Sequence, residues 1–102
     1  MFTGNEDQSI TLTEGHDLTA RYRTANPNAV IGEYFGKKII TDILSQEGCV
    51  GIRMYYGISA DGQPQTVITG VDANGNDLYQ GLIGDRSYKS PPYSGIANPL
   101  NS

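Results

Sequence analysis

The alternation of residue types from Val50 to Ile58 limits the possible folds of this chain more than any other feature. Every second residue in this segment is apolar, namely Val50, Ile52, Met54, Tyr56 and Ile58. Because successive side chains of a strand point to opposite faces of a sheet, the pattern predicts a strand with one buried face. Two more strands are expected after it, at Gln65–Val71, which is rich in β-branched residues, and at about Leu78–Ile83. Turn residues separate the three segments, which predicts an antiparallel three-stranded meander.

Two helices are expected before the meander. Thr11 stands three residues before Glu14, a pair that caps a helix start reciprocally, so a helix is predicted from about Leu12 to Arg23. Leu18 and Tyr22 lie one turn apart on it and are expected to face the core. The second helix, Lys37–Gln46, has its apolar residues at the spacing of an amphipathic helix, namely Ile39, Ile40, Ile43 and Leu44.

These elements predict an α+β fold in which a small antiparallel sheet of three or four strands carries two helices on one face. Ile52, Met54 and Tyr56 are expected on the helix-covered face, with Ile39, Ile43 and Leu44 completing the core. A length of 102 residues leaves room for one domain. We expect it to span residues 1–84, with 1–9 as an N-terminal extension and 85–102 as an extended, Pro-containing C-terminal arm.

Charge and composition argue against several kinds of partner. The net charge is −4, and nucleic acids and anionic lipids are held mainly by Lys and Arg, so neither partner is expected. No apolar run approaches the roughly 20 residues that cross a bilayer, and the first residues lack the basic and apolar parts of a signal peptide. A cytoplasmic location without membrane association is therefore the default expectation.

The residues that could support catalysis or redox chemistry are few. Cys49 is the only cysteine, so no intramolecular disulfide can form, and it is expected to be a buried structural thiol. His16 is the only histidine and is expected to be an exposed helix residue beside Asp17. No catalytic residues are predicted, because no base, nucleophile or carboxylate pair converges in the pattern.

One turn resembles the start of a calcium-binding loop. Asp72, Asn74 and Asn76 alternate as oxygen ligands do in such loops, which makes them candidate metal ligands and Ca²⁺ the one candidate cofactor. The match fails further on, because Gly75 precedes the third ligand and Ile83 stands where a bidentate Glu is needed. The same residues also suit a tight turn between strands, which is the favoured interpretation.

The sheet face opposite the helices is a candidate interface. Arg53 and Tyr55 alternate with the core residues, and Ile68 on the next strand is expected to lie near them. Tyrosine, arginine and an apolar residue are typical of interface cores, so a protein-binding surface is predicted. An ordinary solvated face, or the stacking of a planar ligand on Tyr55, are the alternatives.

The C-terminal arm supplies further interface candidates. Tyr88 and Tyr93 flank Pro91-Pro92, and this extended segment is expected to anchor through the two tyrosines on a sheet edge or on a neighbouring subunit. The alternative is a short proline-rich recognition segment.

The segments Gly48–Tyr56 (GCVGIRMYY) and Gly70–Leu78 (GVDANGNDL) resemble a group of small uncharacterised bacterial proteins, chiefly of the Bacteroidota. The resemblance covers roughly Gly36 to Leu78 and extends to the Pro-Pro tail. It supports the order of elements and implies no activity. Members of the group often carry cysteines beside the Pro-Pro pair where this chain has Ser90 and Ser94, so a cysteine-based role is not implied here.

The function expected from the sequence is association without catalysis, most simply with further copies of the same chain. The content of seven tyrosines and the candidate face of Arg53, Tyr55 and Ile68 motivate this expectation. A dimer is the commonest form of such an assembly, and a docked arm would give a ring or a filament. The alternative is a small-ligand or Ca²⁺-binding domain that uses the Asp72–Asp77 turn, and an enzyme with an unrecognised site ranks third.

Overall fold

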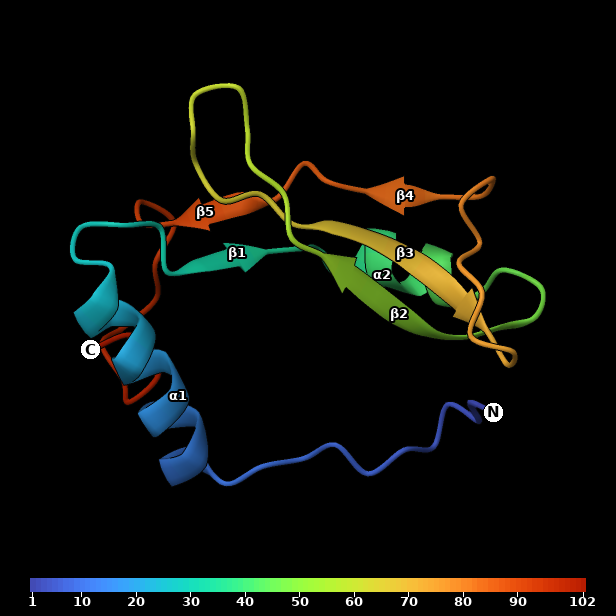
Figure 1. Cartoon of the computed structure of the whole chain (residues 1–102), viewed down its shortest axis with the longest axis horizontal. Helices are drawn as coiled ribbons and strands as arrows, with labels where there is room; N and C mark the ends of the chain where they lie inside the picture. Colours follow the sequence, from blue (N-terminus) through green and yellow to red (C-terminus); the bar gives the residue numbers. More distant parts are fainter. The chain divides into compact units, whose positions relative to one another are not determined.

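The computed structural model describes residues 1–102 and contains two helices and two small antiparallel sheets (Figure 1). The elements, in chain order, are α1 (Leu12–Ala25), β1 (Gly32–Tyr34), α2 (Lys37–Leu44), β2 (Cys49–Tyr55), β3 (Val67–Asp72), β4 (Ile83–Gly84) and β5 (Tyr88–Ser90). One sheet pairs β1 with β5, and the other has the order β2-β3-β4. The predicted α+β class and the meander are confirmed. No helix is long and apolar enough to cross a bilayer.

The chain forms two compact units, each assembled from two stretches of sequence. The first, here called the sheet unit, comprises residues 1–6 and 34–87, and the second, the α1 unit, comprises residues 7–33 and 88–102. The C-terminal residues therefore belong to the same unit as α1. Within it, Arg23 Nη1 donates to the carbonyl oxygen of Leu100 at 2.6 Å. The division into a domain of residues 1–84 and an arm stays a prediction about which part folds independently.

The core of the sheet unit lies between α2 and the three-stranded sheet. Ile43 of α2 and Ile68 of β3 are both fully buried. A β-carbon added to Gly70 would lie 3.3 Å from Ile43 Cγ2, so α2 packs closely on β3 at a glycine. Ile43 therefore confirms the predicted inward face of α2, whereas Leu44, expected in the core, is 45% exposed because α2 ends there.

The register of the sheet contradicts the expected exposure of one residue, Ile68. Residues paired directly across antiparallel strands point to the same face, and the structure pairs Met54 with Ile68 and Arg53 with Thr69. Ile68 therefore lies on the α2 face, fully buried, and not beside Arg53. The prediction of Ile68 as an interface residue was wrong, because a shift of one residue in register moves a side chain to the other face.

The last strand of the meander is shorter than expected. The predicted strand at Leu78–Ile83 is replaced by a turn, closed by the Gly81 N–H donating to the carbonyl oxygen of Leu78 at 3.0 Å. Only Ile83 and Gly84 then pair with β3. β4 is consequently a minimal edge strand.

Helix α1 starts as the sequence predicts. Thr11 and Glu14 form the reciprocal capping box, with the Glu14 N–H donating to Thr11 Oγ1 at 3.1 Å. Leu18 and Tyr22 are exposed, which corrects the expectation that they face the core. The only buried residue of α1 is Gly15, where an added β-carbon would lie 3.2 Å from Leu100 Cδ2. The apolar residues of this helix are too sparse to form a continuous stripe.

Candidate functional site

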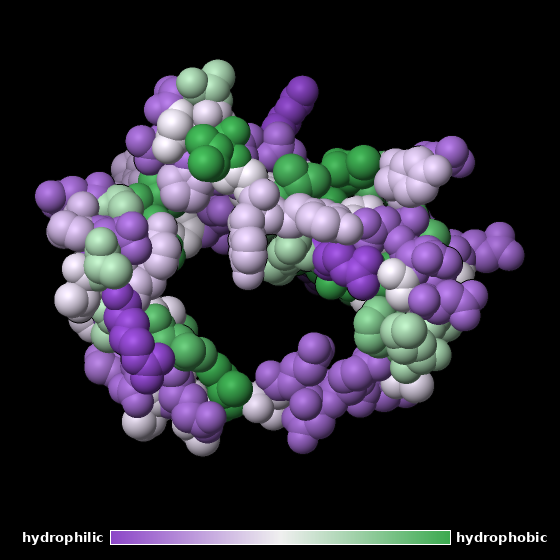
Figure 2. Space-filling view, viewed as in Figure 1, coloured by the Kyte–Doolittle hydropathy of each residue, from purple (hydrophilic) through white to green (hydrophobic).

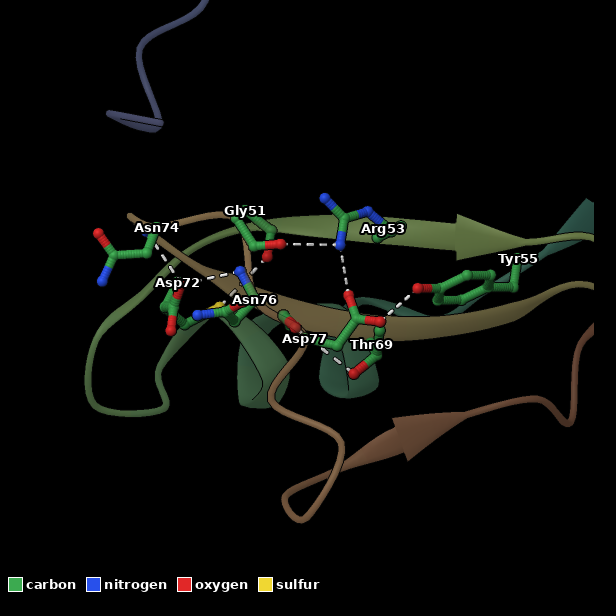
Figure 3. A network of polar contacts seen from close by, with 11 residues as sticks. Gly51, Arg53, Tyr55, Thr69, Asp72, Asn74, Asn76 and Asp77 are labelled. Atoms are coloured by element: carbon green, nitrogen blue, oxygen red, sulfur yellow. Dashed lines mark hydrogen bonds and ion pairs between the residues drawn. The ribbon is translucent and has the colours of Figure 1, made fainter. Parts of the chain in front are cut away.

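A polar network lies on the sheet face opposite α2 and links three residues. Arg53 Nη1 donates to Asp77 Oδ1 at 2.6 Å and to the carbonyl oxygen of Gly75 at 3.1 Å, and the Tyr55 hydroxyl donates to Asp77 Oδ2 (Figure 3). Arg53 and Tyr55 come from β2, whereas Asp77 follows the turn after β3, where it bridges to Val71. The network therefore links the turn between β3 and Asp77 to strand β2 by side-chain hydrogen bonds.

The contacts of the network favour the ionised forms of Asp77 and Arg53 and the neutral form of Tyr55. The hydrogen bond from Tyr55, and then the guanidinium of Arg53, lower the pKa of Asp77 below its usual value. The same hydrogen bond to Asp77 raises the pKa of Tyr55, because ionisation would remove the donor and place a second negative charge beside the carboxylate. The Asp77 carboxylate in turn raises the pKa of Arg53. The charge of Arg53 is thus balanced within the chain.

This network covers the middle of the sheet. Thr69 and Val71 lie on the same face as Arg53, and each is only 4% exposed. The Arg53 and Asp77 side chains keep 35% and 21% of their surface exposed, and Tyr55 keeps 47%. The expected face around Arg53 and Tyr55 is therefore a half-buried polar cluster, of which Tyr55 is the most exposed member.

The N-terminal residues of the sheet unit lie against one end of the β2-β3 hairpin. The Phe2 N–H donates to the carbonyl oxygen of Ala73 at 2.9 Å. Gly4, at φ +85°, approaches Val50 so closely that an added β-carbon would lie 2.7 Å from the Val50 carbonyl oxygen. Part of the predicted N-terminal extension is therefore docked on the hairpin.

The outer edge of β2 is open beyond this contact. The Leu78 N–H donates to the carbonyl oxygen of Gly70 at 2.8 Å, so Gly70 turns its backbone groups away from β2. Backbone groups alternate in direction along a strand. The N–H and C=O groups of Thr69, next to Gly70, therefore point toward β2, where Arg53 is the paired residue. The N–H and C=O groups of Ile52 and Met54 consequently point away from β3, and β2 is the end strand of its sheet.

The predicted calcium ligands share a turn but do not converge. Asp72 Oδ1 accepts hydrogen bonds from the backbone N–H groups of Asn74 and Asn76, both at 2.9 Å. The side-chain amide of Asn74 points away from this carboxylate (Figure 3). Gly75 takes the positive φ, +86°, that the turn requires. The geometry is that of a turn stabilised by its aspartate, and calcium binding stays a prediction.

The two tyrosines of the C-terminal arm contact each other. Tyr88 and Tyr93 stack with ring centroids 5.1 Å apart and an interplanar angle of 30°, and both rings remain exposed. They belong to the α1 unit, whereas Arg53 and Tyr55 belong to the sheet unit. The expected interface residues therefore form two separate pairs, and Ile68 belongs to neither.

The groups considered for catalysis have structural contacts. The Cys49 thiol donates to the carbonyl oxygen of Gly51 at 3.2 Å, and His16 Nδ1 lies 3.3 Å from the neighbouring Asp17. A hollow of about 310 Å³ adjoins Asp77 and is also lined by Gln46. The Gln46 amide spans from α2 to the segment before β4, donating to the Ile43 carbonyl oxygen and accepting from the Leu82 N–H, both at 2.9 Å.

Sequence reasoning missed two features of this region. Asp77 was assigned to a turn, and nothing in the pattern marked it as the shared partner of Arg53 and Tyr55. The run of exposed apolar residues at the end of β2 was also missed, since Met54 and Tyr56 were expected in the core but are 59% and 95% exposed. The alternation signalled two faces, and α2, only eight residues long, covers just part of one.

Comparison of the chain with protein-family models, with curated proteins and with solved structures finds no match.

Proposed function

We propose that this chain is a non-enzymatic protein whose function is association with further copies of itself. The observation that carries the proposal is the small core: Ile43, Ile68 and Val71 are the only buried hydrophobic residues. Many other large apolar side chains are exposed, and the face seen in Figure 2 carries several of them among hydrophilic residues. Single exposed apolar residues are ordinary, but a continuous group marks a contact surface.

Such a group lies at the end of β2. Met54 and Tyr55, the last two residues of β2, point to opposite faces and are both exposed, and Tyr56 and Ile58 just beyond them are 95% and 79% exposed. Tyrosine and methionine are enriched in protein interfaces, where their large side chains lose much apolar surface to the partner. Association would bury the apolar surface that the small core leaves in water.

The charge of the region fits a protein partner better than a polyanion. Arg53 is the only charged residue from Cys49 to Ser59, and Asp77 balances it at 2.6 Å. The net charge of −4 opposes the approach of a nucleic acid. A second copy of this chain would present the same uncharged, tyrosine-containing surface, so the two surfaces would not repel each other. A cytoplasmic location stays a prediction.

The test is the mass in solution, measured by light scattering behind a sizing column over a range of loading concentrations. The proposal expects a mass that rises above 11.0 kDa as the concentration increases. A constant 11.0 kDa at every concentration would refute it. A parallel run with a chelator shows whether the assembly depends on calcium, and a loss of mass there would favour the Ca²⁺-binding alternative at the Asp72–Asp77 turn.

A further inference from the structure

We infer that two copies associate by antiparallel pairing of β2 with β2 of the second copy, in the register that places Met54 opposite Met54. This inference deepens the proposed self-association by naming the contact. The edge of β2 offers the required groups, because the N–H and C=O of Ile52 and Met54 point outward from the sheet. Open strand edges pair readily with another strand.

The position of Gly4 excludes one register. Pairing centred on Ile52 would place Val50 opposite Met54 of the second copy and would require the outward backbone groups of Val50. Gly4 lies against the Val50 carbonyl oxygen, where even an added β-carbon would approach to 2.7 Å. No second strand fits there while residues 1–6 stay docked.

Charge disfavours a second register. Pairing centred on Arg53 would set the two Arg53 side chains directly opposite each other, and like charges across a strand pair destabilise a sheet. Pairing centred on Tyr55 would place Ile58, beyond the end of β2, opposite Ile52.

The register centred on Met54 satisfies all these conditions. It uses residues 52–56 alone, and it sets Arg53 opposite Tyr55 of the second copy, a favourable pairing of a cation with an aromatic ring. Ile52 then lies opposite Tyr56, so the side chain that is 95% exposed in the single chain gains an apolar neighbour. Met54, 59% exposed, contacts its own counterpart.

Cysteine cross-linking in the full chain tests the register. Ile52, Arg53, Met54 and Tyr55 are each replaced by Cys in a Cys49→Ala background, which removes the native thiol. Directly opposed residues in an antiparallel pair have Cα atoms about 4.5 to 5.5 Å apart, within the range of a disulfide. The inference expects Met54→Cys to give the highest yield of covalent dimer on a non-reducing gel. A mixture of Arg53→Cys and Tyr55→Cys chains should cross-link better than either alone.

The outcomes separate this inference from the proposed function. A maximum at Ile52→Cys, Arg53→Cys or Tyr55→Cys overturns the register. An assembly seen by light scattering that cross-links at none of the four positions overturns pairing through β2 and leaves self-association standing. A constant monomer mass overturns both.

A charge variant gives an independent check that does not depend on cross-linking. Met54→Lys changes an exposed residue, so the fold is expected to persist, but it opposes two lysines at the centre of the pair. We expect the dimer to weaken about tenfold or more. Tyr79→Lys is the matched control, since Tyr79 is 68% exposed in the same unit but outside β2. Equal dissociation by both variants would overturn the inference.

Discussion

Replacement of Ile68 by alanine tests the register of the sheet directly, because this residue changes face if the register is wrong. The structure places Ile68 fully buried on the α2 face. A β-carbon added at Gly84 would lie 2.8 Å from Ile68 Cγ1 and 3.0 Å from Ile39 Cγ1, so the side chain is enclosed by β4 and α2. Ile68→Ala therefore leaves a cavity that neighbouring backbone can fill only in part.

The expected loss of stability follows from the atoms removed. Three carbon groups leave the core, and each contributes about 0.8 kcal/mol of transfer free energy, or about 2.5 kcal/mol together. The cavity adds to this, so the free energy of unfolding should fall by about 3 kcal/mol, within a range of roughly 2 to 5 kcal/mol. A domain of this size has a total stability of roughly 5 to 15 kcal/mol, so the loss is easily measured.

Urea denaturation followed by circular dichroism supplies the measurement, at a protein concentration held equal for all variants. Ile58→Ala is the matched control, compared at a concentration at which light scattering shows the monomer: the same side chain is removed from the same unit, but at a position that is 79% exposed, so its cost should stay within about 0.5 kcal/mol. Equal costs at the two positions would refute the assigned register, because Ile68 would then behave as a surface residue.

Three further predictions concern the polar contacts. Asp77 has a lowered pKa in the folded chain, so its contribution to stability is present above its ordinary pKa of 3.8 and is lost as the pH falls toward the folded pKa. Asp77→Asn should therefore reduce the fall of Tm at acid pH. An unchanged fall of Tm would contradict the network. The raised pKa of Tyr55 means that its contribution to stability is complete below its ordinary pKa of 10.0 and is lost as the pH rises through the folded value. Tyr55→Phe should therefore reduce the absorbance change above pH 10 in an ultraviolet titration, and a loss confined to lower pH would contradict the raised pKa of Tyr55. Thr11→Ala should reduce the stability of α1 by about 1 kcal/mol, and Thr11→Asp should retain most of that stability. Amide hydrogen exchange at the start of α1 should become faster in Thr11→Ala. Unchanged exchange would show that the capping box does not stabilise the helix.

The elements that could be predicted from the sequence are those whose signal is local. The alternation around Ile52 and the spacing of Ile39 and Ile43 lie within single elements, and both predicted their secondary structure correctly. The capping box is equally local, since Thr11 and Glu14, three positions apart, contain all its atoms.

The parts that failed depend on how elements meet. Whether Ile68 faces α2 is fixed by its pairing with Met54, and the alternation within one strand does not report which residue of the next strand lies opposite. The contact of Arg53 with Asp77 spans 24 positions and depends on the conformation of the turn between them. Neither relation has a signature within one segment.

The shortness of β4 has a consequence for how large an assembly can become. A sheet with two long free edges can add strands at both and extend without limit, as fibrils do. Here the second edge consists of Ile83 and Gly84 alone, which offers too little backbone for another strand to hold. Under the proposed pairing, growth through β2 would end once two copies have met, because the dimer would have no other edge long enough to add a third strand.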